Sequence, residues 1–330
     1  MITFIVGGSK NGKSHMAEKI VTSGVSEHLY YVATMHKDDE ESKQRVLRHR
    51  MKRQGKGFIT VEQYVSIGRI TEQFQGKNVS VLLECLSNLL ANEMFDMNGT
   101  KVHVVEKIIE DINKIAQQVE HLVIVSNQVS DDGCEYDCDT MDYIQKLGTL
   151  NQEITKIADC VIEAVCGIPI VIKGECDVMN QREKSGCGLE LIIGGQSQGK
   201  LEYLLGQKMY GKEEIAAVIL EDKPVIYNIH RIVRNMLLEY KDASKVRNQV
   251  EEWLNHYIER QPGGVILCNE VGSGIVPMDA FEREYRDLCG TITCMIAARA
   301  NRVHRVICGI GMVIKDDGNT INSTWNDARK

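Results

Sequence analysis

The sequence predicts two consecutive α/β domains, each with a doubly wound and mostly parallel β-sheet, the second being an abridged copy of the first. Three observations lead to this prediction. Apolar, β-rich runs alternate with helical patterns, a glycine-rich loop between a strand and a helix occurs twice, and a later segment of the chain recurs. The chain has 330 residues, 43% of them hydrophobic, so it can bury about two ordinary globular cores.

The first copy is expected to begin with a strand at 2–6, which leads into the loop GGSKNGKS and a helix at 14–21. Further apolar runs predict strands at 29–34, 58–61, 79–84, 121–125 and 160–165. Helical patterns lie near 41–51, 86–92, 102–119 and 140–157. This alternation is typical of βαβ units, which place parallel strands in one sheet.

The second copy is found from the spacing of recurring residues. Gly7 recurs as Gly194, 187 positions later, whereas the segment 158–173 recurs at 300–315, only 142 positions later. The second copy therefore lacks 45 residues, almost all of them before the position that matches Glu84. The expected organisation is a first domain at 1–174, a linker at 175–188, a second domain at 189–315 and a flexible tail at 316–330.

The loop GGSKNGKS matches the phosphate-binding pattern GxxxxGK[ST] and stands between a strand and a helix, as that pattern requires. This context predicts a sheet like that of P-loop NTPases. Main-chain N–H groups of the loop are expected to bind phosphate oxygens, at Gly7, Gly8, Ser9, Lys10, Asn11 and Gly12. Lys13 would meet the β and γ phosphates and Ser14 would hold Mg²⁺. A glycine-rich turn that binds nothing is the alternative interpretation.

The second loop keeps Gly194, Gly199 and Lys200 but has Leu201 where a hydroxyl group should bind the metal. Since leucine cannot ligate Mg²⁺, a structural relic is favoured over a working nucleotide site.

The segment 39–53 is acidic at its start, and its part 45–53 places His49 among four arginines and a lysine. Taken alone, this pattern is typical of a solvated amphipathic helix. However, the basic side chains would also attract phosphates, and nearby cations favour the neutral imidazole that can act as a nucleophile.

Several of these motifs occur together in one family. GGSKNGKS, YVAT, RVLRHR, LLECLSNLLAN and the segment 150–173 resemble the bifunctional adenosylcobinamide kinase / adenosylcobinamide-phosphate guanylyltransferase family of cobalamin biosynthesis. In the second copy the resemblance lies mainly in NEVGSGIVPMDAFEREYRDLCG, at 269–290.

The resemblance implies a transferase with two activities. A nucleoside triphosphate such as ATP phosphorylates the corrinoid adenosylcobinamide, then GTP guanylylates His49, and the GMP passes on to give adenosylcobinamide-GDP. The catalytic residues would be His49 and Lys13. The guanine nucleotide would be contacted by Ala33, Thr34, Met35, Arg50, Met51, Lys52, Arg53, Glu62 and Glu84. Glu84, at the end of a predicted strand, could also help Ser14 to orient Mg²⁺; a solvent-exposed carboxylate is the alternative.

The two copies have lost different pieces of the family pattern. The Asn-Glu-Val-Gly-x-Gly-x-Val-Pro loop is broken in the first copy, at 126–139, but intact in the second, at 269–277, which lacks the histidine segment. We therefore hypothesise a composite site to which the second copy contributes Asn269, Glu270, Pro277, Arg283 and Arg286. A second copy that is only a scaffold is the alternative. The resemblance also implies an oligomer, or a single chain acting as a pseudo-dimer.

Charge and hydropathy limit the possible partners. The formal net charge of -7 argues against coating nucleic acid, and neither a signal peptide nor a membrane span is recognised, so a cytoplasmic protein is expected. Two other functions remain open: a nucleotide-binding regulator or scaffold without turnover, and an enzyme that keeps only one of the two activities.

Overall fold

The computed structural model describes residues 1–24, 26–36, 43, 47, 51, 53, 55–76, 78–129, 136–176 and 188–317. The chain divides into two compact units. The first consists of Met1–Gly7, Lys13–Ala164 and Val171–Asn180, and the second of Gly8–Gly12, Val165–Ile170 and Gln181–Lys330. The short segment Gly8–Gly12 of the glycine loop thus groups with the second unit. The domain boundaries expected from the sequence remain a prediction.

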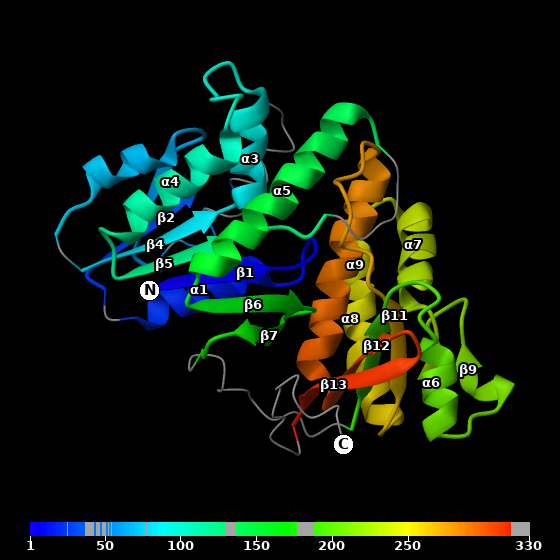
Figure 1. Ribbon diagram of the computed structural model, residues 1–330. Coiled ribbons are helices and arrows are strands. Elements are labelled where there is room, and N and C mark those ends of the chain that lie inside the picture. Colours follow the sequence, from blue (N-terminus) through cyan, green and yellow to red (C-terminus); the bar gives the residue numbers. More distant parts are fainter. Residues whose placement is uncertain are drawn as a thin grey trace. The chain divides into compact units, whose positions relative to one another are not determined.

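The first unit is built on a seven-stranded sheet with the order β3-β2-β4-β5-β1-β6-β7 (Figure 1). Its strands are β1 (Ile2–Val6), β2 (His28–Ala33), β3 (Phe58–Glu62), β4 (Val79–Glu84), β5 (His121–Val125), β6 (Cys160–Val165) and β7 (Ile168–Lys173). Neighbours from β3 to β6 pair in parallel. The six predicted strands are confirmed, and β7 is an additional one.

The helices of this unit are α1 (Lys13–Ser23), the 3-10 helix η1 (Ile67–Gln73), α3 (Leu86–Phe95), α4 (Val104–Ala116) and α5 (Cys138–Ile157). Helix α4 illustrates why they form: Val104, Ile108, Ile112 and Ile115 recur at helical spacing, and all four are buried. Helix α5 begins where the Asp137 carboxylate accepts hydrogen bonds from two main-chain N–H groups. Most of the helix predicted near 41–51 lies outside the described residues.

The second unit has a six-stranded sheet with the order β13-β12-β8-β11-β10-β9. Its strands are β8 (Glu190–Gly194), β9 (Ile215–Ala216), β10 (Val225–Ile226), β11 (Val265–Asn269), β12 (Arg302–Ile307) and β13 (Ile310–Asp316). Strands β12 and β13 pair in the antiparallel direction, and the other neighbouring strands of this sheet in the described residues pair in parallel. The helices are α6 (Lys200–Gln207), the 3-10 helix η3 (Lys212–Glu214), α7 (Ile229–Tyr240), α8 (Ala243–Arg260) and α9 (Ala280–Arg299).

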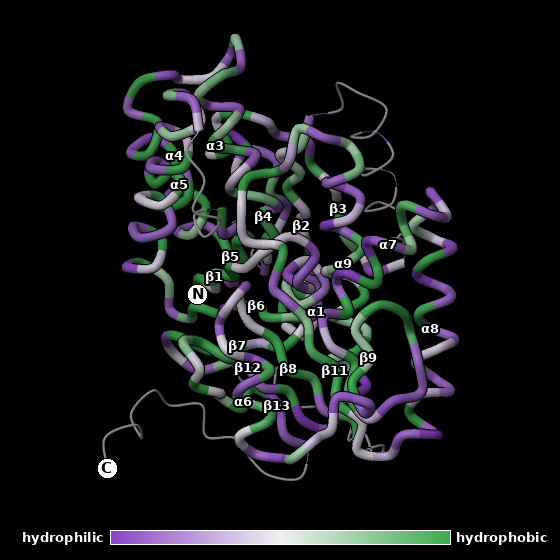
Figure 2. Tube along the Cα trace, turned by 90° about the vertical axis from the view of Figure 1, so that its right-hand side faces the viewer, coloured by the Kyte–Doolittle hydropathy of each residue, from purple (hydrophilic) through white to green (hydrophobic). Residues whose placement is uncertain are grey.

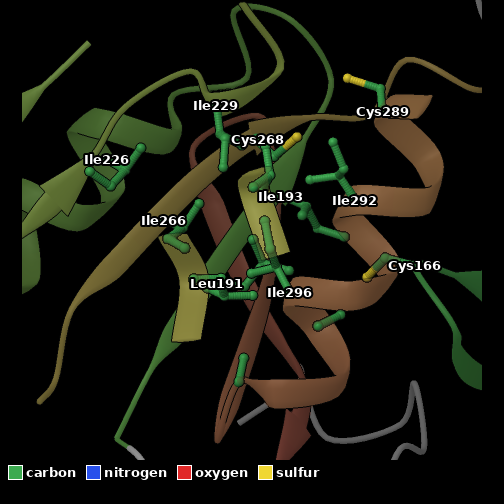
Figure 3. Packing of buried hydrophobic residues seen from close by; sticks show 14 of the residues in the cluster. Cys166, Leu191, Ile193, Ile226, Ile229, Ile266, Cys268, Cys289, Ile292 and Ile296 are labelled. Atoms are coloured by element: carbon green, nitrogen blue, oxygen red, sulfur yellow. The ribbon is translucent and has the colours of Figure 1, made fainter. Parts of the chain in front are cut away.

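The core of the second unit lies between the sheet and its helices. Figure 3 shows Leu191 and Ile266 on the strands and Ile292 and Ile296 on α9, all of them buried. Figure 2 shows the corresponding pattern along the chain, with hydrophobic residues in β11 and many hydrophilic ones in α8.

The two sheets have the same topology, except that one strand is missing from the second. If β3 is left out, the order from β7 to β2 corresponds strand by strand to the order from β13 to β9. Helix α9 begins and ends 142 positions after α5. Even the ends of these helices match, because Lys173 and Lys315 each donate to three main-chain carbonyls at the end of the preceding helix. The duplicated α/β fold is therefore confirmed, and the missing residues include the counterpart of β3.

None of the helices in the described ranges is long and apolar enough to cross a lipid bilayer.

Candidate functional site

The first glycine loop joins β1 to α1 in a conformation that its residues make possible. Gly7 and Gly12 have φ angles of 154° and 86°, and a Cβ atom at Gly7 would lie 2.6 Å from the carbonyl oxygen of Ala164. The buried Lys13 side chain folds back over the loop, and its Nζ donates to the carbonyl of Gly7 at 2.9 Å. This places a cation at the start of α1, where main-chain N–H groups already favour an anion.

Next to the loop, Ser14 is connected to the end of β4. Its hydroxyl donates to Oε1 of Glu84, and the hydroxyl of Tyr31 donates to Oε2 of the same carboxylate at 2.9 Å. Burial, and then the Glu84 carboxylate, raise the pKa of Tyr31 well above its usual value, so Tyr31 is a neutral hydrogen-bond donor. The sequence prediction brought Ser14 and Glu84 together but missed Tyr31.

These side chains fit Mg²⁺. A hydroxyl and one carboxylate are hard oxygen ligands, and Mg²⁺ usually binds to one or two such groups together with phosphate oxygens and water. Among the described residues there is no group of three or more His, Cys, Asp or Glu side chains that could hold a metal ion by itself. Phosphate oxygens and water would have to complete the coordination of a cation bound by Ser14 and Glu84.

Arg53 provides a buried positive charge in the same unit. Its guanidinium carbon lies 3.4 Å from the centroid of the Tyr31 ring, and its side chain is 5% exposed. Its Nε and Nη1 atoms are buried and have no hydrogen-bond partner among the described residues. Since buried donors are normally paired, these two are suited to an anionic ligand. Of its predicted neighbours, Met51 is exposed, whereas His49, Arg50 and Lys52 lie outside the described residues.

The strand register brings other predicted residues to the same edge of the sheet. Ala33 pairs with Glu62 of β3 on one side and with Glu84 of β4 on the other. Thr34 and Met35 follow directly, and the N–H of Thr34 donates to the carbonyl of Glu84 at 3.1 Å. Because the carboxyl ends of parallel strands meet at one edge, these residues form a continuous rim.

Asn92 connects this rim to helix α3, a role that the sequence analysis missed. Its side-chain amide donates to the carbonyl of Thr34 at 2.7 Å and to that of Tyr64 at 2.9 Å. Beside it the ring of His36 stacks on Tyr64, with the centroids 4.1 Å apart, and the Tyr64 hydroxyl donates to Glu62 at 3.0 Å. A polar amide within a mostly apolar helix is the signal that could have identified Asn92.

In the second unit, Asn269 and Glu270 stand at the end of β11. The N–H of Asn269 donates to Nδ1 of His230 at 3.2 Å, and Glu270 forms an ion pair with Arg305 at 3.2 Å. Burial lowers the pKa of His230 to about 4, and the positive charges of Arg231 and Lys200 act in the same direction.

The two arginines of the proposed composite site bind the loop that follows β11. Arg286 donates to the carbonyls of Gly272, Gly274 and Ile275, and Arg283 donates to those of Pro277 and Met278. Both side chains thus stabilise the conformation of this loop.

A small pocket lies within the second unit. Its lining includes Ser9 and Asn11 from the glycine loop and Asn269, Glu270 and Gly272 from the segment after β11. The N–H of Ser9 donates to the carbonyl of Gly272 at 2.8 Å. The pocket is therefore lined both by residues predicted to bind phosphate and by residues predicted for the composite site.

A family model and similar individual proteins point to the same family. The model of the family described as cobinamide kinase / cobinamide phosphate guanyltransferase matches residues 3–172 and again 208–314. The chain is similar to the bifunctional adenosylcobalamin biosynthesis protein CobU of Escherichia coli, with 27% identity over 184 residues, which are 52% of this chain and 100% of that protein. It is also similar to CobP of Pseudomonas aeruginosa, with 25% identity over 181 residues, covering 53% and 99% of the two chains.

Among solved structures, the flagellar accessory protein FlaH from Methanocaldococcus jannaschii is similar at 12% identity and a TM-score of 0.29, over 53% of this chain and 78% of that one. The fold assignment rests on the strand order described above.

Proposed function

Since the chain belongs to the cobinamide kinase / cobinamide phosphate guanyltransferase family, we propose that it is a transferase of cobalamin biosynthesis with both activities of that family. It would phosphorylate adenosylcobinamide with a nucleoside triphosphate such as ATP, and then transfer GMP from GTP to the phosphorylated corrinoid. The observation that carries the proposal is the contact of Ser14 with Glu84 directly after a glycine loop with a buried lysine.

For the kinase step, the loop and Lys13 would bind the β and γ phosphates. Ser14 and Glu84 would hold Mg²⁺, which neutralises charge on the phosphates when it is bound. Tyr31 keeps the Glu84 carboxylate in place through a hydrogen bond of 2.9 Å. The transfer itself needs mainly positioning and electrostatic stabilisation, because the transition state spreads charge over the phosphoryl oxygens.

For the guanylyl step, we propose that a nitrogen of the His49 imidazole attacks the α-phosphorus of GTP. A nitrogen–phosphorus bond forms, the bond to the β-phosphate oxygen breaks, and pyrophosphate leaves. An oxygen of the corrinoid phosphate then attacks the same phosphorus, and the histidine leaves. Arg53, four positions after His49, supports this step, because its buried donors can bind the phosphates.

Two alternatives have their own motivation. The broken segment 126–139 of the first copy and the second glycine loop, which lacks the metal-binding hydroxyl, motivate a nucleotide-binding regulator or scaffold without turnover. An enzyme with one activity would result if His49 does not reach the nucleotide. An oligomer or an intrachain pseudo-dimer, and a cytoplasmic location, are further parts of the proposal.

The test is incubation of the purified protein with GTP labelled at the α-phosphate. We expect label on the protein that is lost in acid and kept in alkali, absent from His49→Ala and present in the matched control His256→Ala, an exposed residue of α8. Label that persists in His49→Ala would refute the histidine carrier, and reversible binding without label would favour the regulator. Product analysis with adenosylcobinamide and with its phosphate separates the two activities.

A further inference from the structure

Asp287 of helix α9 contacts the glycine loop inside the second unit, to which Gly8–Gly12 belongs. One carboxylate oxygen, Oδ1, accepts a hydrogen bond from the Ser9 hydroxyl at 3.0 Å. The other, Oδ2, lies 3.5 Å from Nζ of Lys10. A single side chain therefore holds two consecutive residues of the loop.

The loop residue that Asp287 holds has an unusual backbone conformation. Lys10 has a φ angle of 54°, in the left-handed region that residues with a Cβ atom seldom occupy. Its carbonyl accepts a hydrogen bond from Sγ of Cys294 at 3.2 Å, and the preceding N–H, of Ser9, donates to Gly272. The conformation of Lys10 is thus supported by side-chain and main-chain contacts together.

The close approach of the glycine loop to α9 and to the segment after β11 depends on two further glycines. A Cβ atom at Gly290 would lie 2.8 Å from Cβ of Lys10 and 3.0 Å from the carbonyl oxygen of Ser9. A Cβ atom at Gly272 would lie 2.9 Å from that same oxygen. The main chain on both sides would have to move, so this contact tolerates no larger residues at either glycine.

We propose that Asp287 is a positioning residue for nucleotide binding. It fixes Ser9 and Lys10 in the conformation that directs the N–H groups of the following loop residues towards phosphate, so that a bound nucleotide does not have to order the loop. The abridged copy thereby has a function although its own loop has lost the metal ligand. This inference rests on the proposed function for the identity of the nucleotide.

The contact of Asp287 with Lys10 is not repeated at the matching positions of the two copies. The residue that matches Asp287 in the first copy, 142 positions earlier, is Gln145, and the residue that matches Lys10 in the second loop is Ser197. Neither the carboxylate nor the lysine is present there, so the ion pair has no counterpart at these positions.

The experiment compares Asp287→Ala and Asp287→Asn with Glu282→Ala. The control removes a carboxylate of the same helix that pairs with Arg234 and does not contact residues 8–12. The readouts are hydrogen exchange of the peptide containing residues 8–14 without nucleotide, and the Kd for Mg²⁺-ATP and for GTP. In Asp287→Ala, which loses a hydrogen bond and an ion pair, we expect faster exchange and roughly fivefold weaker binding. Asp287→Asn keeps an acceptor for Ser9 and should be intermediate.

The inference is overturned if Asp287→Ala leaves both exchange and Kd unchanged, or if Glu282→Ala alters them equally, since the effect would then be a general loss of stability. If the unaltered protein binds neither triphosphate, the proposed function fails. The exchange measurement without nucleotide still decides whether Asp287 orders the loop, so the two failures are distinguishable.

Discussion

The two glycine loops have nearly the same backbone but different side-chain chemistry. Three positions of each loop have positive φ angles, 154°, 54° and 86° in the first and 157°, 58° and 80° in the second, at Gly7, Lys10 and Gly12 and at Gly194, Ser197 and Gly199. In the second loop, Nζ of Lys200 also donates to loop carbonyls, those of Gly194 and Gly195.

The two loops differ in the side chains at the two positions predicted to bind the metal ion. Ser14 and Glu84 have Leu201 and Tyr227 as their counterparts, so the hydroxyl–carboxylate contact has no equivalent at those positions. The same pattern of φ angles thus occurs in both loops, whereas the proposed metal site would depend on two side chains, Ser14 and Glu84, that the second loop does not match.

The largest expected difference between the two loops is in the effect of removing the lysine of each. We expect Lys13→Ala to slow phosphorylation of adenosylcobinamide by roughly 10²- to 10³-fold, because a positioned charge on the transferred phosphate is lost. Lys200→Ala should change the rate by less than about twofold, although it removes buried hydrogen bonds and lowers stability. Initial rates with saturating corrinoid and a urea unfolding curve measure both effects. Equal rate losses in the two variants would mean that the second loop also takes part in turnover.

A second prediction exchanges the residue that follows each lysine. Ser14→Leu gives the first loop the sequence feature of the second, and we expect Mg²⁺-dependent binding of nucleotide to become roughly 10- to 100-fold weaker. Calorimetric titration with and without Mg²⁺ measures the difference. The control Leu201→Ser should add no second nucleotide equivalent, because Tyr227 cannot replace a carboxylate. Unchanged Mg²⁺ dependence in Ser14→Leu would remove Ser14 from the metal site.

The third prediction compares Asn92 of helix α3 with the matching residue of helix α7. Asn92→Ala leaves the carbonyls of Thr34 and Tyr64 without their amide donor, so we expect stability to fall by about 1–3 kcal/mol and GTP binding to weaken several-fold. Asn235, the matching residue of α7, is exposed, and Asn235→Ala should change stability by less than about 0.5 kcal/mol. A GTP affinity that is unaffected by Asn92→Ala would separate the rim from guanine binding.

The smallest expected effect is on the pH dependence of stability. His230 has its pKa lowered to about 4 by burial and nearby cations, so the folded protein keeps it neutral while the unfolded chain binds a proton below about pH 6.5. Stability should therefore fall as the pH is lowered from about 6.5 to 4, with a slope below the limit of about 1.4 kcal/mol per pH unit for one group.

His230→Asn cannot ionise but can still accept the N–H of Asn269, so the loss of stability between pH 7 and pH 5 should be smaller than in the unaltered protein. Urea unfolding at the two pH values measures it. The exposed His256→Asn serves as the control. An identical pH dependence in the unaltered protein and His230→Asn would assign the acid sensitivity to other groups.

Sequence reasoning predicted the strands and the duplication well, since both depend on local periodicity and on residue spacing. It also placed Ser14 near Glu84, because parallel strands end at one edge of a sheet. It did not find Tyr31, Asn92 or Asp287, whose side chains could equally have been part of a core or a solvated surface. The roles assigned to all the site residues remain predictions, and His49, Arg50 and Lys52 lie outside the described ranges.

The order of the elements and the family could be inferred from the sequence alone, because both follow from patterns of neighbouring residues. The hydrogen bonds of Tyr31 to Glu84 and of Ser9 to Asp287 were found only in the folded structure, because they join residues 53 and 278 positions apart. The physical reason is that such contacts depend on strand register and on the close approach of main chains at glycine, which local patterns do not specify.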